Sequence, residues 1–157
     1  MSATKLSDLQ GLKDIEGGAI DPSRFAGKVV FAMNVASACG YTKPGYELLK
    51  RLTDKFAPAD FVAVAIPCNS FLWQESGSAE DVKTFALARA DKLLVTEKAA
   101  VNGNHPHPIV ALAKQAFPGR VMWNFDGRFV FDRNGVPVAR FGNSAKPEEI
   151  EAAIANA

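Results

Sequence analysis

Two apolar runs in the first half of the chain predict buried strands. Residues 29–35 (VVFAMNV) and 61–67 (FVAVAIP) are almost continuously apolar and contain β-branched residues, a pattern typical of strands that are covered on both faces. Between them, the apolar residues of the segment 46–56 recur at helical spacing. Ser78, followed three residues later by Asp81, predicts the start of a helix that continues through ALARA. The pattern therefore predicts the order strand, helix, strand, helix.

The second half continues this alternation and ends with a hairpin and a helix. Residues 93–99 (LLVTEKA) are compatible with a strand, and a proline-broken loop then leads to an amphipathic helix at 109–117. Asn-Gly at 134–135 lies between two alternating apolar runs, which is a strong signal for a β-hairpin. The tail from residue 146 has a proline and acidic residues at its start, as expected for a final helix.

These elements predict one α/β domain over residues 1–157. The expected architecture is a mixed central sheet flanked by helices, and it resembles thioredoxin-like domains. Residues 8–27 are expected to add an N-terminal β-hairpin, with Gly17 and Gly18 at its tip.

Composition and charge narrow the function classes. The chain has 157 residues, a hydrophobic fraction of 48% and a net charge of +1, without a long run of either charge. We therefore expect a small-molecule or protein partner, and neither a nucleic acid nor an anionic lipid surface. The sequence has no signal-peptide pattern and no apolar run long enough for a membrane span, so a cytoplasmic location is expected. The two cysteines, Cys39 and Cys68, do not form a CxxC pair.

Cys39 is the first candidate for chemistry. It lies among small residues in NVASACGYT (34–42), and small residues leave the backbone open to approach. The predicted layout places it at the end of a strand and just before a helix. Catalytic groups gather at such strand ends, and the positive end of a helix stabilises a thiolate. The alternative interpretation is a small buried hydrophobic residue, because free cysteines are often fully buried.

Three segments together resemble the glutathione peroxidase family. NVASACGYT is similar to the segment that carries the family's reactive cysteine or selenocysteine. IPCNSFLWQESG (66–77) is similar to its PCNQFxxQEPG motif, and MWNFDGRFVFDRNG (122–135) to its WNF motif. VNGNHPHP (101–108) resembles the family's VNGxxxHP stretch. The order and spacing of the motifs agree over residues 8–155, so the resemblance covers nearly the whole chain.

The resemblance implies a thiol-dependent peroxidase that reduces hydrogen peroxide or organic and lipid hydroperoxides. Its catalytic set carries over to Cys39, Gln74, Trp123 and Asn124. Cys39 would attack the peroxide oxygen and become a sulfenic acid. The two amides and the indole N–H are donors that do not titrate, and they would stabilise the sulfur and the departing oxygen. No prosthetic cofactor is implied; the co-substrate is a thiol reductant, either glutathione or a thioredoxin-type protein.

The chain departs from the family pattern at three places. Ala86 stands where many cysteine-type members carry a resolving cysteine, so the sulfenic acid would meet an external thiol directly or pair with Cys68, the candidate resolving residue. Leu72 and Trp73 replace two glycines before Gln74, which suggests a preference for apolar hydroperoxides. The segment NFDGRFVF is one residue longer than the family's usual NFxKFLV.

His105 and His107 are expected to form a turn before a helix rather than a metal site. Prolines stiffen their loop and no metal-ligand spacing is recognisable. His107-Pro108 also fits the HP start of a helix that the resemblance implies. The short connection from residue 117 to the WNF motif lacks the long insertion of tetrameric members, so a monomer is expected.

Two alternatives remain open at the level of sequence. A peroxide sensor or redox relay would use the same reactive Cys39 but pass the oxidation to a partner protein. Cys39 could also occupy the position of a selenocysteine in the natural protein, which would make this chain the slower version of a faster enzyme.

Overall fold

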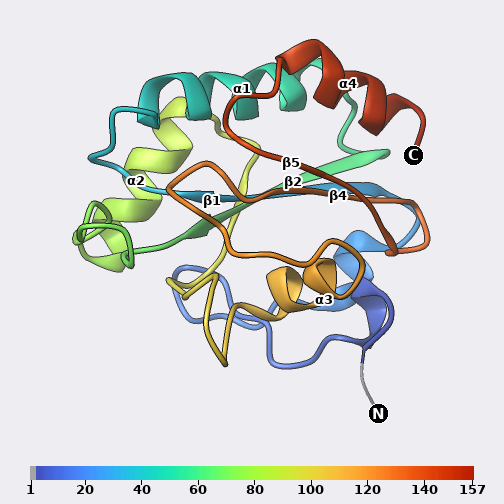
Figure 1. Cartoon of the computed structure of the whole chain (residues 1–157), viewed down its shortest axis with the longest axis horizontal. Coiled ribbons are helices and arrows are strands. Elements are labelled where there is room, and N and C mark those ends of the chain that lie inside the picture. Colours follow the sequence, from blue (N-terminus) through green and yellow to red (C-terminus); the bar gives the residue numbers. More distant parts are fainter. Residues whose placement is uncertain (1–2) are drawn as a thin grey trace.

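The computed structural model describes residues 3–157 and contains a five-stranded mixed sheet (Figure 1). Its strands lie in the order β3-β2-β1-β4-β5. Their bounds are β1 Val29–Val35, β2 Phe61–Pro67, β3 Leu94–Val95, β4 Arg128–Phe131 and β5 Pro137–Phe141. β1, β2 and β3 are parallel, whereas β4 pairs antiparallel with β1 and β5 pairs antiparallel with β4. The predicted α/β architecture with a mixed sheet is confirmed.

Helices cover both faces of this sheet. Their bounds are α1 Thr42–Lys55, α2 Ala79–Arg89, α3 Pro108–Ala116 and α4 Pro147–Ala155. In Figure 1, α1 and α4 lie on one side of the sheet, and α3 lies on the other side with the N-terminal segment. The buried apolar residues form two clusters accordingly, which we call the α1-side core and the α3-side core.

The continuous apolar character of β1 follows from these two cores. All seven of its residues are buried. Phe31 and Met33 contribute to the α1-side core, while Val30 and Ala32 contribute to the α3-side core. Because side chains alternate between the two faces of a strand, a strand covered on both faces must be apolar at nearly every position.

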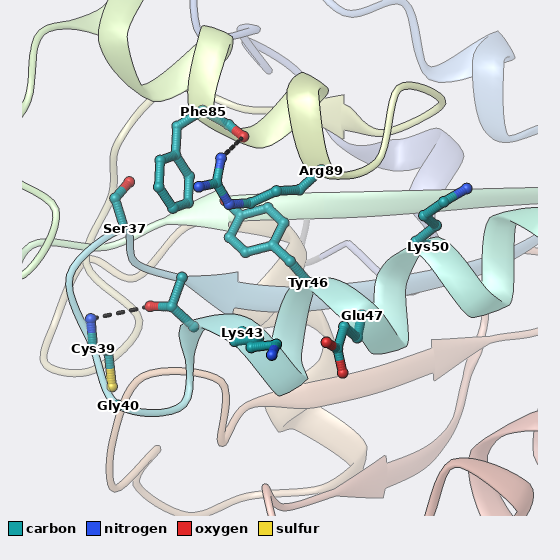
Figure 2. A pocket seen from close by; sticks show the side chains of 10 residues that line it. Ser37, Cys39, Gly40, Lys43, Tyr46, Glu47, Lys50, Phe85 and Arg89 are labelled. Carbon is teal, nitrogen blue, oxygen red and sulfur yellow. Dashed lines mark hydrogen bonds between the residues drawn. The ribbon is translucent and has the colours of Figure 1, made fainter.

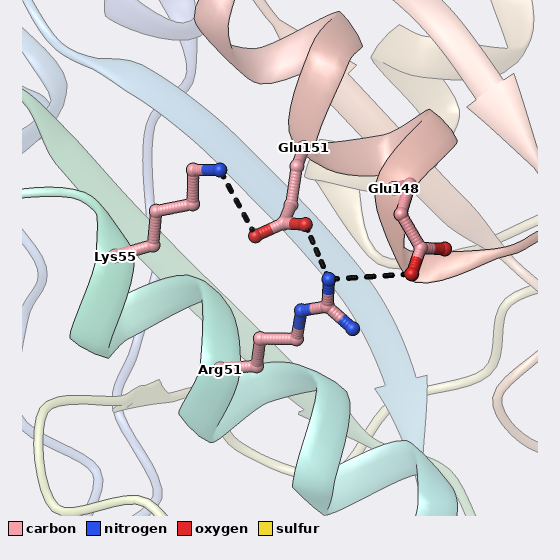
Figure 3. Close-up of polar contacts among 4 residues, drawn as sticks. All are labelled: Arg51, Lys55, Glu148 and Glu151. Atoms are coloured by element: carbon pink, nitrogen blue, oxygen red, sulfur yellow. Dashed lines mark hydrogen bonds and ion pairs between the residues drawn. The ribbon is translucent and has the colours of Figure 1, made fainter.

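Polar contacts fasten α4 to α1 at the surface (Figure 3). Arg51 of α1 lies 2.7 Å from Glu151 and 3.5 Å from Glu148 of α4, and Lys55 lies 3.4 Å from Glu151. The hydrogen bond from Arg51 holds the pKa of the Glu151 carboxyl below its usual value. The network supplements the apolar contact of Ile150 and Ile154 with the α1-side core.

Most predicted elements are present, with shifted ends. α1 begins at Thr42, four residues before the apolar periodicity starts, and the strand predicted at 93–99 is reduced to Leu94–Val95. The helix start predicted at Ser78 and Asp81 is confirmed, and the two residues form a capping box at the start of α2. The hairpin of β4 and β5 is also formed, and Gly135 adopts the left-handed φ of 78° in its turn. That conformation favours glycine, which explains the Asn-Gly signal.

The N-terminal β-hairpin expected over residues 8–27 is much smaller than predicted. The turn at Gly17 and Gly18 exists, but a single antiparallel bridge between Lys13 and Ala19 is the only pairing across it within residues 3–157. Two short 3-10 helices flank it, Leu6–Asp8 and Pro22–Phe25. The segment is held by burial of Leu12 and Ile20 in the α3-side core and by an antiparallel bridge between Asp14 and Thr96, just after β3.

Candidate active site

Cys39 lies in the loop between β1 and α1, as the sequence predicts. Its side chain is partly exposed, and it packs against the α1-side core. The backbone N–H of Tyr41 donates to the Cys39 sulfur at 3.4 Å. The Cys39 N–H donates to Thr42 Oγ1 at 3.0 Å, and that hydroxyl donates to the Ala36 carbonyl at 2.9 Å. The first turn of α1 therefore fixes the loop, and the backbone N–H of Tyr41 points at the sulfur.

The loop that carries Gln74 is bonded to the Cys39 loop. The N–H groups of Ser37 and Ala38 donate to the Gln74 carbonyl at 3.1 and 3.0 Å. The Ser37 hydroxyl also donates to the carboxylate of Glu75. Three hydrogen bonds thus hold Gln74 and Glu75 against the residues that immediately precede Cys39.

Asn124 reaches this loop from the segment before β4. Its side-chain amide donates to Gln74 Oε1 at 2.9 Å, and both side chains lie at the end of the sheet where β1 and β2 finish. Asn124 is fully buried, and its own Oδ1 has no hydrogen-bond partner within residues 3–157. The structure therefore joins two of the predicted donors directly, across 50 residues of sequence.

Asn34 of β1 positions the turn that carries Trp123. Its side-chain amide donates to the Trp123 carbonyl at 3.0 Å, and its Oδ1 accepts from the Gly127 N–H at 2.9 Å. The Phe125 N–H donates to the Asn34 carbonyl at 2.9 Å. The indole of Trp123 is partly buried and packs against Phe71, with ring centres 5.5 Å apart.

The four predicted catalytic residues therefore come from three loops that are bonded to one another. Within the hydrogen bonds of residues 3–157, however, none links the Cys39 sulfur to Gln74, Trp123 or Asn124. Gln74 and Asn124 are joined by their side chains, whereas Cys39 and Trp123 are joined to them through the backbone of their loops.

Leu72 and Trp73 explain why two glycines suit the positions before Gln74. Their φ angles are 55° and 52°, in the left-handed region that disfavours side chains. Both side chains point into solvent, with 66% and 75% of their surface exposed. The backbone thus keeps a glycine-type turn while presenting two large apolar groups next to Gln74.

Cys68 follows β2 and has different surroundings. It is fully buried and belongs to the α3-side core, and its N–H donates to the Val35 carbonyl at 3.0 Å. Cys39 packs against the other core. Burial and the separate core disfavour direct pairing of the two sulfurs.

A cleft of about 530 Å³ lies beside Cys39, between α1 and α2 (Figure 2). Its walls carry apolar and cationic groups, which are Tyr46 and Phe85 with Lys43, Lys50 and Arg89; Ser37 and Glu47 also line it. Gln74, Trp123 and Asn124 are not among its lining residues.

His107 immediately precedes α3, as predicted, and its side chain caps the helix. Its Nδ1 accepts from the Ile109 N–H at 3.1 Å, and Pro108 is the first residue of the helix. Burial lowers the pKa of the His107 imidazole to about 4. Within residues 3–157, no group of three or more His, Cys, Asp or Glu residues has the arrangement of a metal site.

Glu75 and Asn34 are structural parts of the site that sequence reasoning missed. Glu75 is fully buried, and burial raises the pKa of its carboxyl although the hydrogen bond from Ser37 acts in the opposite direction. A charged residue in a loop is expected to face solvent, so nothing in the sequence indicated that Glu75 is buried. A signal for Asn34 did exist, because it is the single polar residue in the apolar run of β1.

The fold and the position of Cys39 place the chain in the class of thioredoxin-fold proteins. A thioredoxin-like protein from Aeropyrum pernix matches with a TM-score of 0.66 at 18% identity, over 93% of this chain and 88% of that chain. The particular family follows from closer comparisons. A family model described as "Glutathione peroxidase" matches residues 8–114, and the chain belongs to the glutathione peroxidase family.

Relatives of known sequence and structure agree. The chain is 36% identical over 151 residues to "Probable glutathione peroxidase 5" of Arabidopsis thaliana, covering 93% of this chain and 87% of that protein. It is also 36% identical over 151 residues to "Hydroperoxy fatty acid reductase gpx1" of Synechocystis, covering 89% and 88%. The crystal structure of T. cruzi GPX1 matches with a TM-score of 0.75 at 32% identity, over 96% of this chain and 94% of that chain.

Family membership fixes the general activity. The chain is a thiol-dependent peroxidase, an oxidoreductase that acts on peroxides. The family uses glutathione or thioredoxin as reductant, and no prosthetic group is indicated. No helix in residues 3–157 has the length and apolar character that crossing a membrane requires.

Proposed function

We propose that Cys39 is the peroxidatic residue and that Gln74, Trp123 and Asn124 stabilise the charges of the reaction. The observation that carries the proposal is the position of Gln74: its carbonyl accepts from the loop of Cys39, and its side chain accepts from Asn124. Gln74 thereby connects the loop of Cys39 to the WNF motif, which contains Asn124.

In the proposed reaction the Cys39 thiolate attacks one peroxide oxygen. The O–O bond breaks, Cys39 becomes a sulfenic acid, and the other oxygen leaves as an alkoxide or hydroxide that takes up a proton. Amide and indole N–H groups favour this step because negative charge moves from the sulfur to the leaving oxygen and they can donate to either.

An external thiol then reduces the sulfenic acid. Ala86 is fully buried in α2 and supplies no sulfur, and Cys68 is buried in the other core. These positions favour a cycle with Cys39 as the single redox cysteine, and glutathione or a thioredoxin-type protein as the electron source.

Apolar hydroperoxides are the proposed preferred substrates. The exposed side chains of Leu72 and Trp73 lie beside Gln74, and Met122 next to Trp123 is 67% exposed. These groups form an apolar rim that an alkyl or acyl chain can contact, whereas hydrogen peroxide gains nothing from it. A relative at 36% identity is named as a hydroperoxy fatty acid reductase, in keeping with this preference.

The assembly and location remain proposals from the sequence. We propose that the chain acts as a one-domain monomer, because only residues 117–122 connect the end of α3 to Trp123. The expected cytoplasmic location gains no support from relatives, since they include proteins named as chloroplastic and mitochondrial.

Steady-state peroxide consumption with excess reductant tests the donor roles. Gln74→Ala and Asn124→Ala are each expected to lower kcat/KM by about 10²–10³-fold, the usual loss on removal of one such donor. Asn69→Ala, a change in the same loop whose side chain contacts the backbone of Glu75, is the matched control and is expected to lower the rate far less. Equal losses in all three variants would contradict a specific role for Gln74 and Asn124.

The same assay separates an enzyme from a redox relay. Sustained peroxide loss over many equivalents is expected because this family turns over with soluble thiols. A single stoichiometric oxidation, without further turnover in excess glutathione or thioredoxin, would support the relay.

A further inference from the structure

Glu75 carries a fully buried carboxyl that the proposed reaction does not use. It follows Gln74 in the loop after β2, and the residue is 0% exposed. Its Oε1 accepts from the hydroxyl of Ser37, whereas its Oε2 has no hydrogen-bond partner within residues 3–157. Burial of a carboxyl costs free energy that burial of an apolar side chain does not, so the position of Glu75 calls for an explanation.

Tyr46 of α1 is a second buried residue with an unpaired polar atom. The residue is 2% exposed, and its hydroxyl has no hydrogen-bond partner in the described part of the chain. Burial raises the pKa of the Tyr46 phenol, and the charge of the nearby Glu75 adds to this effect. Buried polar groups are nearly always paired. One hydrogen bond between Glu75 Oε2 and the Tyr46 hydroxyl, direct or through one water, satisfies both atoms.

This connection is possible in either charge state of Glu75. Burial raises the pKa of the Glu75 carboxyl, while the hydrogen bond from Ser37 and the charge of Lys98 act in the opposite direction. The acid form donates from one oxygen and accepts at the other, and the ionised form accepts at both. A hydroxyl such as that of Tyr46 donates or accepts as required. Glu75 can therefore connect Ser37 to Tyr46 without a fixed charge.

Ser37 and Tyr46 lie on opposite sides of Cys39 along the chain. Ser37 is two residues before Cys39, and Tyr46 belongs to α1, which begins three residues after it. In Figure 2 the side chains of Ser37 and Tyr46 point toward α2, and the Cys39 sulfur points away from α2. The Glu75 carboxyl thus acts on the loop that carries the sulfur and not on the sulfur itself.

We propose that Glu75 is a positioning residue of the peroxidatic site, and that its carboxyl holds together the two sides of the Cys39 loop, Ser37 and Tyr46. The inference rests on the proposed roles of Cys39 and Gln74. Because Glu75 directly follows Gln74, the same contacts also fix the donor Gln74 relative to the nucleophile. A misplacement of about 1 Å between reacting groups can lower a rate by about 10²-fold, so a residue that touches neither reactant can still control the rate.

The rate at which peroxide oxidises Cys39 tests the proposal. Each protein is mixed with one equivalent of hydrogen peroxide, the reaction is quenched at intervals, and the oxidised fraction of Cys39 is measured by mass. Glu75→Ala removes both contacts and is expected to slow oxidation by about 10–100-fold. Glu75→Gln keeps an acceptor for Ser37 and a polar group for Tyr46, so its rate should stay close to that of the wild type. Glu97→Ala removes an exposed glutamate and should leave the rate unchanged.

The partners of Glu75 give a second test that does not require a change in the buried carboxyl. Ser37→Ala removes the donor to Oε1 at a half-buried residue, and Tyr46→Phe removes the hydroxyl while keeping the ring. Both are expected to slow oxidation, and each by less than Glu75→Ala, because each removes one contact of two. The double variant of Ser37→Ala with Glu75→Ala should be no slower than Glu75→Ala alone.

Alkylation by iodoacetamide at the same pH separates positioning from a loss of structure. The thiol needs no amide donors for this reaction, so Cys39 should be alkylated in Glu75→Ala as fast as in the wild type. Cys68 is fully buried and should stay unlabelled in a folded protein. If Cys68 is labelled in Glu75→Ala, that variant has opened, and the rates of Ser37→Ala and Tyr46→Phe decide the proposal.

Three outcomes would overturn the assignment: wild-type oxidation rates in Glu75→Ala or in both partner variants, a rate of Glu75→Gln as low as that of Glu75→Ala, or alkylation of Cys39 that falls as much as its oxidation. The last result would place the effect of Glu75 on the thiol itself. If peroxide does not oxidise Cys39 in the wild type at all, the proposed function fails, and the wild-type measurement shows this before any variant is compared.

Discussion

Cys39 and Cys68 follow neighbouring parallel strands at the same edge of the sheet, but their surroundings differ. The register pairs Val35 with Pro67, so the two strands end at the same level; Cys68 follows its strand directly, and Cys39 lies in the loop beyond Val35. Cys39 continues into an open loop and a helix, whereas Cys68 turns into the α3-side core and is fully buried. The end of a strand thus brings a cysteine to the edge of the sheet, and the segment that follows the strand determines whether its thiol is accessible to a peroxide.

The largest expected difference between the two cysteines is in catalytic turnover after each is replaced. Cys39→Ser is expected to abolish thiol-dependent peroxide turnover, because serine cannot form the sulfenic acid. Cys68→Ser is expected to keep activity within about twofold and to lower stability, since it puts a hydroxyl into a buried apolar site at a cost of about 1–3 kcal/mol. Peroxide consumption and thermal unfolding measure the two effects. Loss of turnover in Cys68→Ser at a temperature where it is folded would give both cysteines a catalytic role.

Low pH is expected to lower the stability of the protein through His107, which caps α3 on the side of the sheet where Cys68 is buried. His107 caps α3 as a neutral imidazole with a pKa of about 4, whereas the ordinary value of about 6.5 applies when the chain is unfolded. Between these values the unfolded chain binds the extra proton. This contribution to stability is therefore complete above about pH 6.5 and is lost as the pH falls toward 4, by about 3 kcal/mol.

Denaturant unfolding at several pH values measures this loss. His107→Asn keeps an acceptor for the Ile109 N–H and does not titrate, so its stability should fall less between pH 7 and 4. His105→Asn, which changes an exposed histidine in the same loop, should keep the full slope. Equal slopes in all three proteins would rule out His107 as the cause.

On the side of the sheet where Cys39 lies, adding a methyl group at Gly45 tests how tightly α1 packs against the residue after Asn124. A Cβ placed on Gly45 in the first turns of α1 would lie 2.2 Å from Cδ1 of Phe125, so either the helix or the turn after Asn124 must move. Gly45→Ala is expected to cost about 1–3 kcal/mol of stability despite the better helix propensity of alanine. Gly40→Ala, where a Cβ meets nothing within 4 Å, is the control for denaturant unfolding. Equal stability of the two variants would show that the contact relaxes without cost.

The smallest effect is expected in the strained turn before Gln74. Leu72→Gly relieves a left-handed φ of 55° and is expected to raise stability by about 0.5–1 kcal/mol, the strain being partly offset by the entropy of glycine. The same change removes one apolar group of the proposed rim, so the rate ratio of cumene hydroperoxide to hydrogen peroxide should fall. Leu72→Ala should lower the ratio without the gain in stability. An unchanged ratio in both variants would remove Leu72 from substrate recognition.

The fold could be predicted where a local rule links the residues to their structure. The apolar run of β1 follows from burial of both faces of a strand, and the Asn-Gly turn of the last hairpin follows from the left-handed φ that glycine tolerates. The start of α1 could not be predicted, because Pro44 and Gly45 disfavour a helix. Pro44 is tolerated because it lies in the first turn, and Gly45 is suited to its position because it packs closely on Phe125. The hairpin expected over 8–27 forms only one bridge across its turn, because burial of Leu12 and Ile20 and the bridge from Asp14 to Thr96 hold the segment instead.

The candidate site was predicted from motifs, but its connections were not. The hydrogen bond between Asn124 and Gln74 joins distant segments, and no local rule gives it. Glu75 and Asn34 were missed because their roles depend on which segments the fold brings beside them.

Intact-mass spectrometry after one equivalent of hydrogen peroxide, with and without glutathione, tests the central claim most directly. With peptide mapping, wild type is expected to carry one added oxygen or one glutathione adduct at Cys39 alone, and Cys39→Ser should carry neither. Loss of two hydrogens that maps to a disulfide between Cys39 and Cys68 would contradict the account. Cys68 would then be the resolving residue, and thioredoxin the reductant to expect.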